Sequence, residues 1–323
     1  MQGKASPTSS AHAQIYIGVD VCKDGLDIYF HPLGKKLRVS NDRLGLTQLR
    51  RACKGLHIVR VAMEATGKYH RLAHRTMYAW GLTVAVVNPL RARLFAEALG
   101  ALAKTDTIDA RMLALLAERL APDETPPPAE PLEALQELVR ARQSAMADRT
   151  ALLNQRGEAR IAFLRAELAR RIKAAETYIA RLDEEIAARI AAEPILARRR
   201  EILLSIPGVG PVAAAVLLVC LHEIGSCSAK QAALLAGLAP IACDSGDKTG
   251  QRHIRGGRAH VRSGIYMAAV AAARCNPSLA TFYKRLRDAG KAAKVALTAV
   301  MRKLVVLANV LVKEDRTWRP ISS

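Results

Sequence analysis

The sequence predicts an α/β domain at the N-terminus, followed by a mainly helical region. Residues 15–40 alternate apolar and polar side chains with the period of β-strands, and residues 41–120 switch between helical and strand patterns. Residues 121–131 (APDETPPPAEP) contain five prolines, which favours a stiff linker. The stretch that follows, up to Pro194, has no proline and repeats apolar residues every three or four positions, as long helices do.

The first three elements are predicted to be short antiparallel strands. Turns at Asp24-Gly25 and around Pro32 and Gly34 interrupt the alternating pattern and therefore bound the strands. The strands are 15–21 (IYIGVDV), 26–30 (LDIYF) and 36–40 (KLRVS).

The elements that follow alternate between helix and strand. They are a helix capped by Asn41 that runs to about Cys53, a strand at 57–64, a helix at 66–81, a strand at 82–89, and helices up to residue 120. Three strands followed by helix, strand, helix, strand and helix is the order of a ribonuclease-H-like α/β domain. The crossover helices in that order make the later strands parallel to the first.

Acidic residues fall where this topology builds functional sites. Asp20 lies near the end of the first strand and Glu64 at the end of the fourth, and adjacent parallel strands present their carboxyl ends at one edge of the sheet. Asp106 and Asp109, three positions apart in AKTDTIDARMLALLAERL, share one face of a helix. Acids in a first helical turn also favour the positive end of the helix dipole, so their spacing alone leaves two interpretations open.

The fold order favours the metal-binding interpretation. Four converging carboxylates would repel one another unless divalent cations neutralised them. Oxygen ligands select Mg²⁺ or Mn²⁺, and two such ions can activate a nucleophile and stabilise the leaving oxygen of a phosphodiester. The expected metal ligands, which are also expected to be catalytic, are Asp20, Glu64, Asp106 and Asp109.

The charge of the chain indicates a polyanionic partner. There are 49 Lys and Arg against 29 Asp and Glu, a formal net charge of +20. Nucleic acid is the commonest large polyanion, and an anionic membrane surface is the alternative. Between Lys248 and Lys303, 13 basic residues accompany the single acid Asp288, so a phosphate backbone is expected there. Residues 1–14 lack the apolar core of a secretion signal and no run of 18 apolar residues occurs, which predicts a cytoplasmic protein that does not span a membrane.

Residues 132–200 are predicted to form a long helical region of coiled-coil type. Its apolar stripe consists of Leu164, Leu168, Ile172, Ala175, Ile179, Leu182, Ile186 and Ile190. Spacings of three and four favour one arm of an antiparallel hairpin or a seam between subunits. A helix packed on its own domain is the alternative.

The C-terminal region begins with a glycine-containing turn. LLSIPGVGPVAAAVLLV (203–219) joins two helical segments through Gly208 and Gly210, and it resembles the turn of a helix–hairpin–helix. Such a turn exposes backbone N–H groups to a phosphate, although glycine pairs also form tight corners between helices.

A polar, glycine-rich loop within GLAPIACDSGDKTGQRHIRGGRAHVRSGIYMAA (237–269) contains Ser245. An exposed serine among guanidinium groups is a candidate nucleophile toward phosphate, because the cations bind the scissile group and spread its developing charge. A Ser-Gly pair in a loop is otherwise an ordinary turn, and no Ser-His-Asp spacing supports a protease-like triad. The cations of this loop, expected to contact nucleic acid, are Lys248, Arg252, Arg255, Arg258 and Arg262.

Several motifs, in order, resemble those of the DEDD-type insertion-sequence transposases. They are IGVDV, MEATG, KTDTIDARMLA, IPGVGP, GLAP, DSG and GGRAHVRSGIYMAA, and the resemblance covers residues 15–312. That family is related to the Piv-type DNA invertase and is described as bridge-RNA-guided serine recombinases. The resemblance implies that the four acids hold Mg²⁺ and that Ser245 attacks the DNA phosphate.

The resemblance also implies a domain plan and an assembly. In a homotetramer, a dimer of dimers, the acids of one protomer would meet the serine of another, and a noncoding RNA would pair with target and donor DNA. The expected parts are a disordered lead-in (1–14), a RuvC-like domain (15–120), a proline-rich linker (121–131), a coiled-coil region (132–200) and a transposase domain (201–323).

The function predicted from the sequence is therefore recombination of DNA through a phosphoserine intermediate with Mg²⁺. Two alternatives remain open. One is a RuvC-like endonuclease for four-way junctions, in which water attacks and Ser245 is a turn residue. The other is a non-catalytic, basic RNA-binding protein whose acids are structural.

Overall fold

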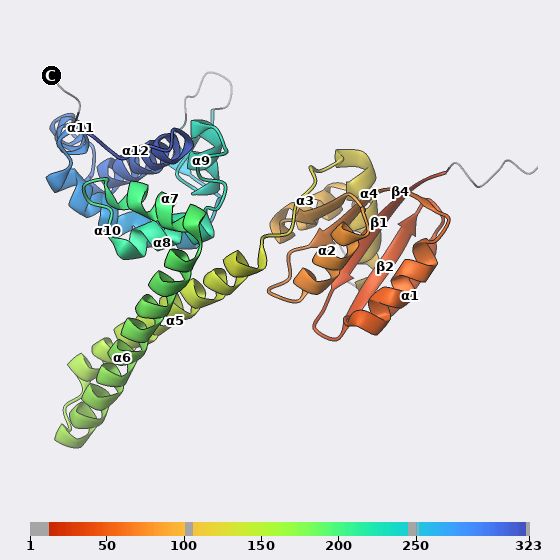
Figure 1. Cartoon of the computed structure of the whole chain (residues 1–323), viewed down its shortest axis with the longest axis horizontal. Coiled ribbons are helices and arrows are strands. Elements are labelled where there is room, and N and C mark those ends of the chain that lie inside the picture. Colours follow the sequence, from red (N-terminus) through yellow and green to blue (C-terminus); the bar gives the residue numbers. More distant parts are fainter. Residues whose placement is uncertain (1–12, 101–105, 245–249, 251, 321–323) are drawn as a thin grey trace, which may run out of the picture. The chain divides into compact units, whose positions relative to one another are not determined.

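A computed structural model describes residues 13–100, 106–244, 250 and 252–320. The chain divides into two compact units, unit 1 (Met1–Pro128) and unit 2 (Ala129–Ser323). In Figure 1, unit 1 runs from red to yellow and unit 2 from yellow-green to blue.

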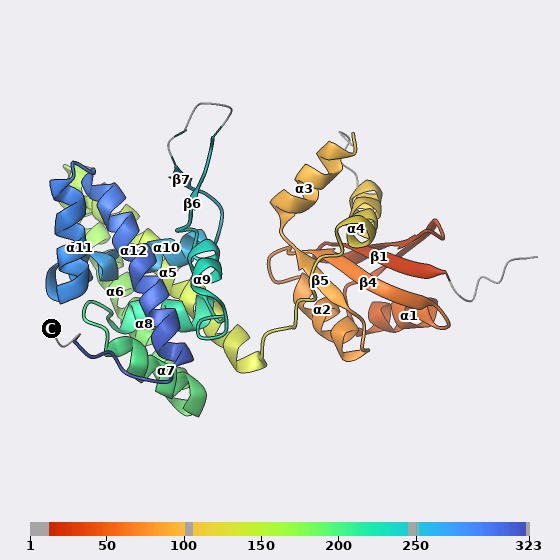
Figure 2. The same ribbon diagram turned by 90° about the horizontal axis from the view of Figure 1, so that it is seen from above.

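Unit 1 is a five-stranded sheet with helices on both faces (Figures 1 and 2). Its strands are β1 (Gln14–Val21), β2 (Gly25–His31), β3 (Lys35–Ser40), β4 (His57–Glu64) and β5 (Val84–Val87), and its helices are α1 (Arg43–Cys53), α2 (His70–Ala79), α3 (Pro89–Ala98) and α4 (Asp106–Leu120). The strand order is β3-β2-β1-β4-β5, antiparallel across the first three and parallel from β1 to β5. The strand directions, and the order of the elements along the chain, are those that the sequence predicted.

Alternate residues of the strands pack against different helices. Ile17 and Val19 of β1 are fully buried in a core that also contains residues of α1 and α2. On the opposite face, Ala62 of β4 packs with Leu113 and Ala117 of α4. Because side chains alternate along a strand, the even-numbered positions 18, 20, 62 and 64 face α4.

The cap of α1 differs from the prediction by one residue. The carboxylate of Asp42 accepts a hydrogen bond from the Gly45 amide at 2.8 Å, so Asp42 is the N-cap. The side-chain amide of Asn41 donates instead to the backbone carbonyl oxygens of Cys22 and Tyr69, each at 3.0 Å. Asn and Asp are both favourable N-cap residues. Here Asp42 caps the helix, because the side chain of Asn41 is engaged in hydrogen bonds to distant parts of the chain.

The proline-rich segment is partly bound to the sheet. Thr125 donates its amide to Val84 of β5 at 2.8 Å, and its hydroxyl accepts the Val86 amide at 3.1 Å. The buried ring of His74 contacts the Thr125 carbonyl at 2.6 Å. The first half of this segment therefore covers the edge strand β5, and α5 begins at Glu130, one residue before its last proline.

The described residues of unit 2 form helices and one short ribbon. Its helices are α5 (Glu130–Glu158), α6 (Ala162–Ala192), α7 (Pro194–Leu204), α8 (Pro211–Cys220), α9 (Ala229–Leu235), α10 (Ala259–Cys275), α11 (Pro277–Asp288) and α12 (Ala293–Lys313). The ribbon pairs β6 (Pro240–Ile241) with β7 (His253–Ile254). Prolines begin α7, α8 and α11, where the missing N–H costs no helical hydrogen bond.

Helices α5 and α6 form the antiparallel hairpin that the sequence favoured as one possibility. Arg142 forms a bidentate pair with Asp183 at 2.5 and 3.0 Å, and Arg149 bonds Glu176 at 2.8 Å. Five stripe residues of α6 are buried within the chain: Ile172, Ile179, Leu182, Ile186 and Ile190. These five residues therefore need no second subunit to cover them, whereas Leu164 at the start of α6 is exposed, and coiled-coil geometry for this pair stays a prediction.

Helix α12 is long and apolar enough to cross a membrane, with a mean hydropathy of 2.0, although half of it is buried in the protein. Its buried residues include Val300, Leu304 and Ala308, which are fully enclosed in the core cluster of unit 2. A helix that packs in this way has the contacts of a core helix.

Candidate active site

Asp20 and Glu64 lie side by side on neighbouring parallel strands. Val19 of β1 pairs with Met63 of β4, so the next position on each strand is an acid. Both side chains are partly exposed, and both lie on the face that α4 covers. The structure thus brings together these two residues, which are 44 positions apart in the sequence.

The first turns of α4 contact β1 at a glycine. A Cβ atom on Gly18 would lie 1.9 Å from the Ala110 carbonyl oxygen and 2.4 Å from the Ala114 amide nitrogen, so only glycine permits this approach. Asp109 directly precedes Ala110, and Asp20 lies two positions beyond Gly18 on the same face. The backbone next to Asp109 is therefore held against β1 near the position of Asp20, whereas the side chain of Asp106 lies outside the described residues.

A fifth acid that the sequence reasoning missed belongs to this face. Asp27 of β2 pairs directly with Asp20 of β1, and side chains opposite each other in an antiparallel pair lie about 5 Å apart at Cβ. Asp27 also forms an ion pair with Arg38 of β3 at 3.1 Å. The pairing of residue 27 with residue 20 follows from a turn centred on Lys23 and Asp24, one residue before the predicted turn at Asp24-Gly25, and that one-residue difference hid the pairing.

The donor chemistry of this face fits a hard divalent cation. Its acids supply only oxygen ligands, which Mg²⁺ and Mn²⁺ prefer. Among the side chains that the structure describes, no three potential ligands converge closely enough to form a metal site by themselves. A site here would thus depend on Asp106 or on movement of the described acids.

The loop that contains the candidate serine begins and ends in residues that pair with each other. Ser245 and Lys248 lie outside the described residues. Residues 242–252 connect the exposed strands β6 and β7, which Figure 2 shows beside α9 and α10. The carboxylate of Asp244 accepts the Gly250 amide at 3.1 Å, so the residue before Ser245 bonds across the loop.

The predicted phosphate-binding cations fall into two groups. Arg252 and Arg255 are exposed near β7. Arg258 instead forms a bidentate ion pair with Glu223 at 2.5 and 2.6 Å, and Arg262 donates to two backbone carbonyls of unit 2. Sequence reasoning did not find Glu223, which lies 35 positions before its partner.

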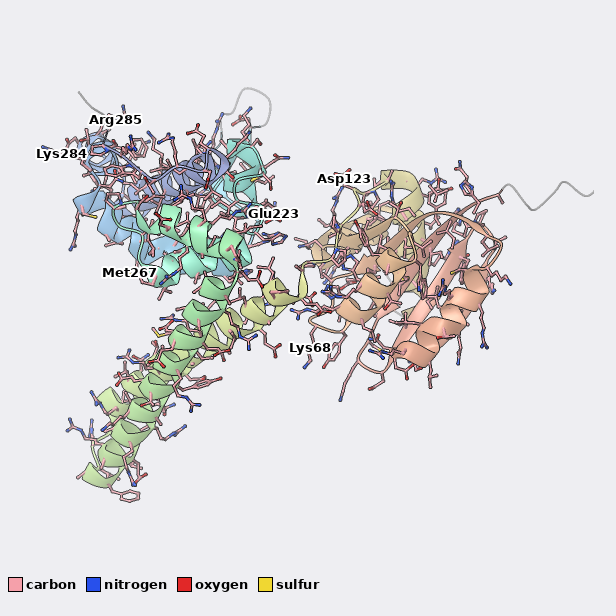
Figure 3. The ribbon with its side chains drawn as sticks, viewed as in Figure 1. Lys68, Asp123, Glu223, Met267, Lys284 and Arg285 are labelled. Atoms are coloured by element: carbon pink, nitrogen blue, oxygen red, sulfur yellow. The ribbon has the colours of Figure 1, made fainter. Side chains whose placement is uncertain are left out.

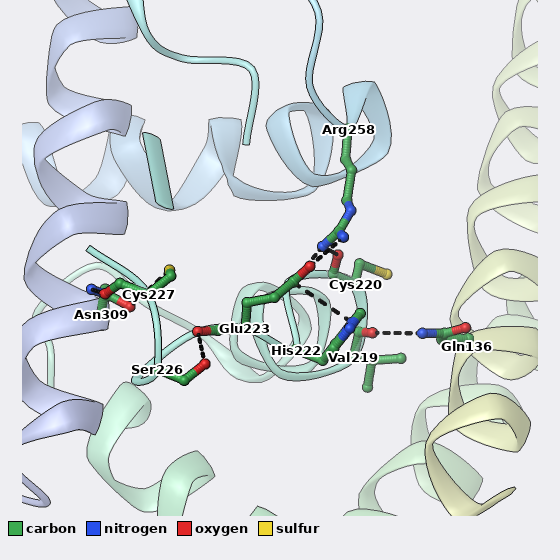
Figure 4. A network of polar contacts seen from close by, with 9 residues as sticks. All are labelled: Gln136, Val219, Cys220, His222, Glu223, Ser226, Cys227, Arg258 and Asn309. Carbon is green, nitrogen blue, oxygen red and sulfur yellow. Dashed lines mark hydrogen bonds and ion pairs between the residues drawn. The ribbon is translucent and has the colours of Figure 1, made fainter. Parts of the chain in front are cut away.

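Figure 4 shows the polar network around Glu223. Burial alone would raise the pKa of Glu223, but the hydrogen bonds and charge of Arg258 outweigh that effect, and the pKa is lowered. Burial, helped by the charge of Arg258, lowers the pKa of His222. On the other side, Asn309 of α12 accepts the Gly225 amide at 2.8 Å and donates to the Cys227 carbonyl at 2.9 Å. The segment between α8 and α9 is therefore fixed to both α10 and α12.

The turn between α7 and α8 is a tight helix corner at its first glycine. Gly208 has φ +100°, and a Cβ there would lie 2.5 Å from the Ala272 amide nitrogen of α10. Gly210 is exposed, caps α8, and has open space around it. Phosphate binding at this turn stays a prediction, and Gly210 is the glycine that a ligand can approach.

A strongly basic surface covers α11, α12 and the turn between them. Figure 3 labels two of its residues on α11, Lys284 and Arg285. Its exposed cations are Lys284, Arg285, Arg287, Lys291, Lys294, Arg302 and Lys303. This basic surface offers phosphate contacts that the sequence indicated only as a run of charge.

Two parts of the chain match known protein families. Residues 17–158 match the family of DEDD transposases described as "Transposase", and residues 200–284 match the "Transposase IS116/IS110/IS902 family". The two matches lie in order and together cover more than half of the chain, which is therefore a transposase. It belongs to the IS110/IS116 family of insertion-sequence transposases.

Relatives with curated descriptions agree with this assignment. The "Pilin gene-inverting protein" of Moraxella bovis is 29% identical over 325 residues, covering 95% of this chain and 98% of that protein. The protein of the same name from Moraxella lacunata has the same identity and coverage. An uncharacterized 42 kDa protein of insertion element IS900 from Mycobacterium paratuberculosis is 31% identical over 162 residues, which are 49% of this chain and 39% of that protein. Transposases cleave DNA and transfer its strands, and the DEDD class suggests use of a divalent metal ion.

Proposed function

We propose that this transposase is a DNA recombinase that cuts and rejoins strands through a phosphoserine intermediate at Ser245. The observation that best supports the proposal is the placement of Asp20, Glu64 and the first turns of α4 on one face of the sheet in unit 1. The similarity to proteins named for gene inversion supports recombination of DNA as the overall reaction.

The bond changes balance without an external energy source. The Ser245 hydroxyl oxygen attacks a DNA phosphorus, the bond from phosphorus to one deoxyribose oxygen breaks, and that oxygen leaves as a hydroxyl after taking up a proton. A hydroxyl of the partner strand then attacks the phosphoserine, restores a phosphodiester and releases the serine. Because one ester replaces another at each step, rejoining needs no ATP.

The acids of unit 1 would hold the metal. Asp20, Glu64, Asp106 and Asp109 would bind Mg²⁺ or Mn²⁺, which supplies Lewis-acid stabilisation of the phosphate when bound. The exposed Arg252, together with Lys248 and Arg255, would bind the phosphate backbone beside the serine.

The proposal also includes a guide RNA and a homo-oligomer. A noncoding RNA of the element would select target and donor DNA by base pairing, and a homotetramer would deliver the serine of one protomer to the acids of another. The tip of the α5–α6 hairpin offers a surface for such contacts, because Ile161, Phe163 and Leu164 are 62%, 68% and 45% exposed. We propose a cytoplasmic location, bound to the chromosome during the reaction.

A trapping experiment tests the chemistry. Purified protein is incubated with Mg²⁺, the RNA transcribed from the element's flanks, and end-labelled duplexes that span the junctions of the element. Denaturation should leave DNA attached to the wild-type protein but not to Ser245→Ala, while both proteins bind the duplexes equally. Asp20→Asn should lose the adduct as well, whereas the exposed-surface variant Glu185→Gln should keep it.

The outcomes separate the alternatives. Cleavage by Ser245→Ala at the wild-type rate would show that water attacks, as in a junction endonuclease. Nucleic-acid binding that needs neither Mg²⁺ nor Asp20, with no cleavage by any variant, would indicate a non-catalytic binding protein.

A further inference from the structure

We propose that Glu223, Arg258 and Arg262 are positioning residues that fix the ribbon base, defined as residues 235–239 and 255–258. These two stretches lead into β6 and out of β7, and the segment with Ser245 connects those strands. The inference rests on the proposed role of Ser245. It assigns to Arg258 and Arg262 a task other than binding phosphate.

The two stretches of the ribbon base touch through their backbones. Gly237 and Gly257 have φ values of +67° and +64°. A Cβ on Gly257 would lie 2.2 Å from the Gly237 nitrogen, and one on Gly237 would lie 2.4 Å from the Gly256 carbonyl oxygen. The Arg258 amide also donates to the Leu235 carbonyl at 2.7 Å. The stretches can therefore approach this closely only without side chains at these two positions.

Arg262 links the two stretches from α10. One of its terminal nitrogens donates to the carbonyl of Gly237 at 3.2 Å and to that of Gly256 at 3.3 Å. Each carbonyl belongs to a different stretch, so one guanidinium holds both. The same nitrogen lies 2.3 Å from the position that a Gly237 Cβ would occupy, which shows how closely the group fills this corner.

Arg258 fixes the second stretch to the rest of unit 2. Its guanidinium donates to both carboxylate oxygens of Glu223 and to the Cys220 carbonyl at 3.0 Å. The side chains of Arg258 and Glu223 are only 29% and 28% exposed. Asn309 holds the segment that carries Glu223 against α12, and α12 is a core helix. The ribbon base is thereby connected to the hydrophobic core.

These contacts oppose phosphate binding by the same groups. If Arg258 turned to a phosphate, the partly buried carboxylate of Glu223 would lose its partner, and an unpaired buried charge is costly. If Arg262 turned outward, two carbonyls would lose their donor. Arg252 and Arg255 are exposed beside them and can bind a phosphate without such losses. A nucleophile reacts faster when the backbone that carries it is rigid, because a displacement of about 1 Å can reduce a rate roughly a hundredfold.

The test uses Glu223→Gln in the full-length protein, because an anionic residue cannot itself bind phosphate. Three quantities are measured: amide hydrogen exchange at residues 233–240 and 253–258 of the protein alone, the rate of adduct formation with the labelled junction duplexes, and the affinity for those duplexes across a salt series. Glu185→Gln is the matched control, because it makes the same charge change on the exposed face of α6.

The expected result is specific to positioning. Exchange at the ribbon base should become about tenfold faster and adduct formation at least about tenfold slower, the factor for losing one charge-assisted hydrogen bond. Affinity and its salt dependence should equal those of Glu185→Gln. Tighter DNA binding with an unchanged adduct rate would overturn the proposal, because it would mean that Glu223 restrains a phosphate-binding Arg258.

A second variant keeps the test decisive if Glu223→Gln unfolds unit 2. Arg262→Lys preserves the charge but cannot hold both carbonyls in the same way, and Arg274→Lys on the exposed face of α10 is its control. Unchanged exchange and adduct rates in Arg262→Lys would overturn the proposal. Should Ser245→Ala retain the adduct, the proposed function fails, whereas hydrogen exchange still decides whether the ribbon base is fixed by these residues.

Discussion

Replacing Gly18 with Ala should separate the proposed metal ligands by moving α4 away from the sheet. The added Cβ would lie 1.9 Å from the Ala110 carbonyl oxygen and 2.4 Å from the Ala114 amide nitrogen. Both are backbone atoms, so no side-chain rotation relieves the clash. Helix α4 would have to retreat by roughly 1 Å before the shorter distance reaches 3.0 Å.

Two magnitudes follow from that displacement. Overpacking of this kind costs typically about 1–3 kcal/mol, and we expect the upper part of that range because the helix must move as a body. A shift of about 1 Å in the Asp109 carboxylate should reduce single-turnover cleavage roughly a hundredfold. Binding of DNA by the basic surface of unit 2 should not change, because α4 belongs to unit 1.

The assays are urea denaturation and single-turnover cleavage at saturating Mg²⁺. Gly25→Ala is the matched control in the same sheet, because its Cβ would have an ordinary contact of 3.4 Å with the Val39 carbonyl oxygen. If Gly18→Ala unfolds within about 0.5 kcal/mol of Gly25→Ala and cleaves as fast, α4 does not set the position of the acids and the reasoning is refuted.

Further changes test other parts of the structure. Thr125→Val removes the acceptor at the edge of β5 and should lower the unfolding free energy of unit 1 by about 1 kcal/mol in urea denaturation. Asn309→Leu leaves an amide and a carbonyl without partners and should cost unit 2 about 2–3 kcal/mol in the same assay. Because folding lowers the pKa of Glu223 from 4.5, its stabilising effect is complete above that pH and is lost as the pH falls through the folded pKa. Protection of the ribbon base, corrected for intrinsic exchange, should therefore fall below pH 4.5 in the wild type but not in Glu223→Gln. Lys294→Ala should reduce the slope of log affinity against log salt by about 1 in a binding titration, without changing the unfolding transition.

The sequence predicted the sheet well because its signals are local. Alternation marks each strand, and Asp24-Gly25 marks the turn between β1 and β2 to within one residue. The handedness of crossover connections then determines which strands are parallel to β1. The end positions of Asp20 and Glu64 follow from the same local patterns, so their proximity was predictable from a single chain.

Other features depend on contacts between distant residues and could not be predicted in this way. The stripe of α6 has the same spacing whether a second subunit or α5 covers it, and only the pairing of Arg142 with Asp183 and its neighbours selects α5. Gly208 looks identical in sequence as a phosphate-binding turn and as a helix corner, and only its approach to Ala272 shows the close packing of a corner, while phosphate binding at this turn stays a prediction.

The roles of the cations from residue 248 onward also depend on distant residues. An arginine that binds phosphate and an arginine that binds a carboxylate of its own chain contribute equally to net charge, and only the distant Glu223 distinguishes Arg258. Exposed cations give an affinity that falls steeply with salt, whereas a partly buried ion pair is screened much less. Raising the salt concentration should therefore weaken binding through the basic surface before it loosens the ribbon base. A transposase built in this way would dissociate from DNA while its ribbon base stays fixed.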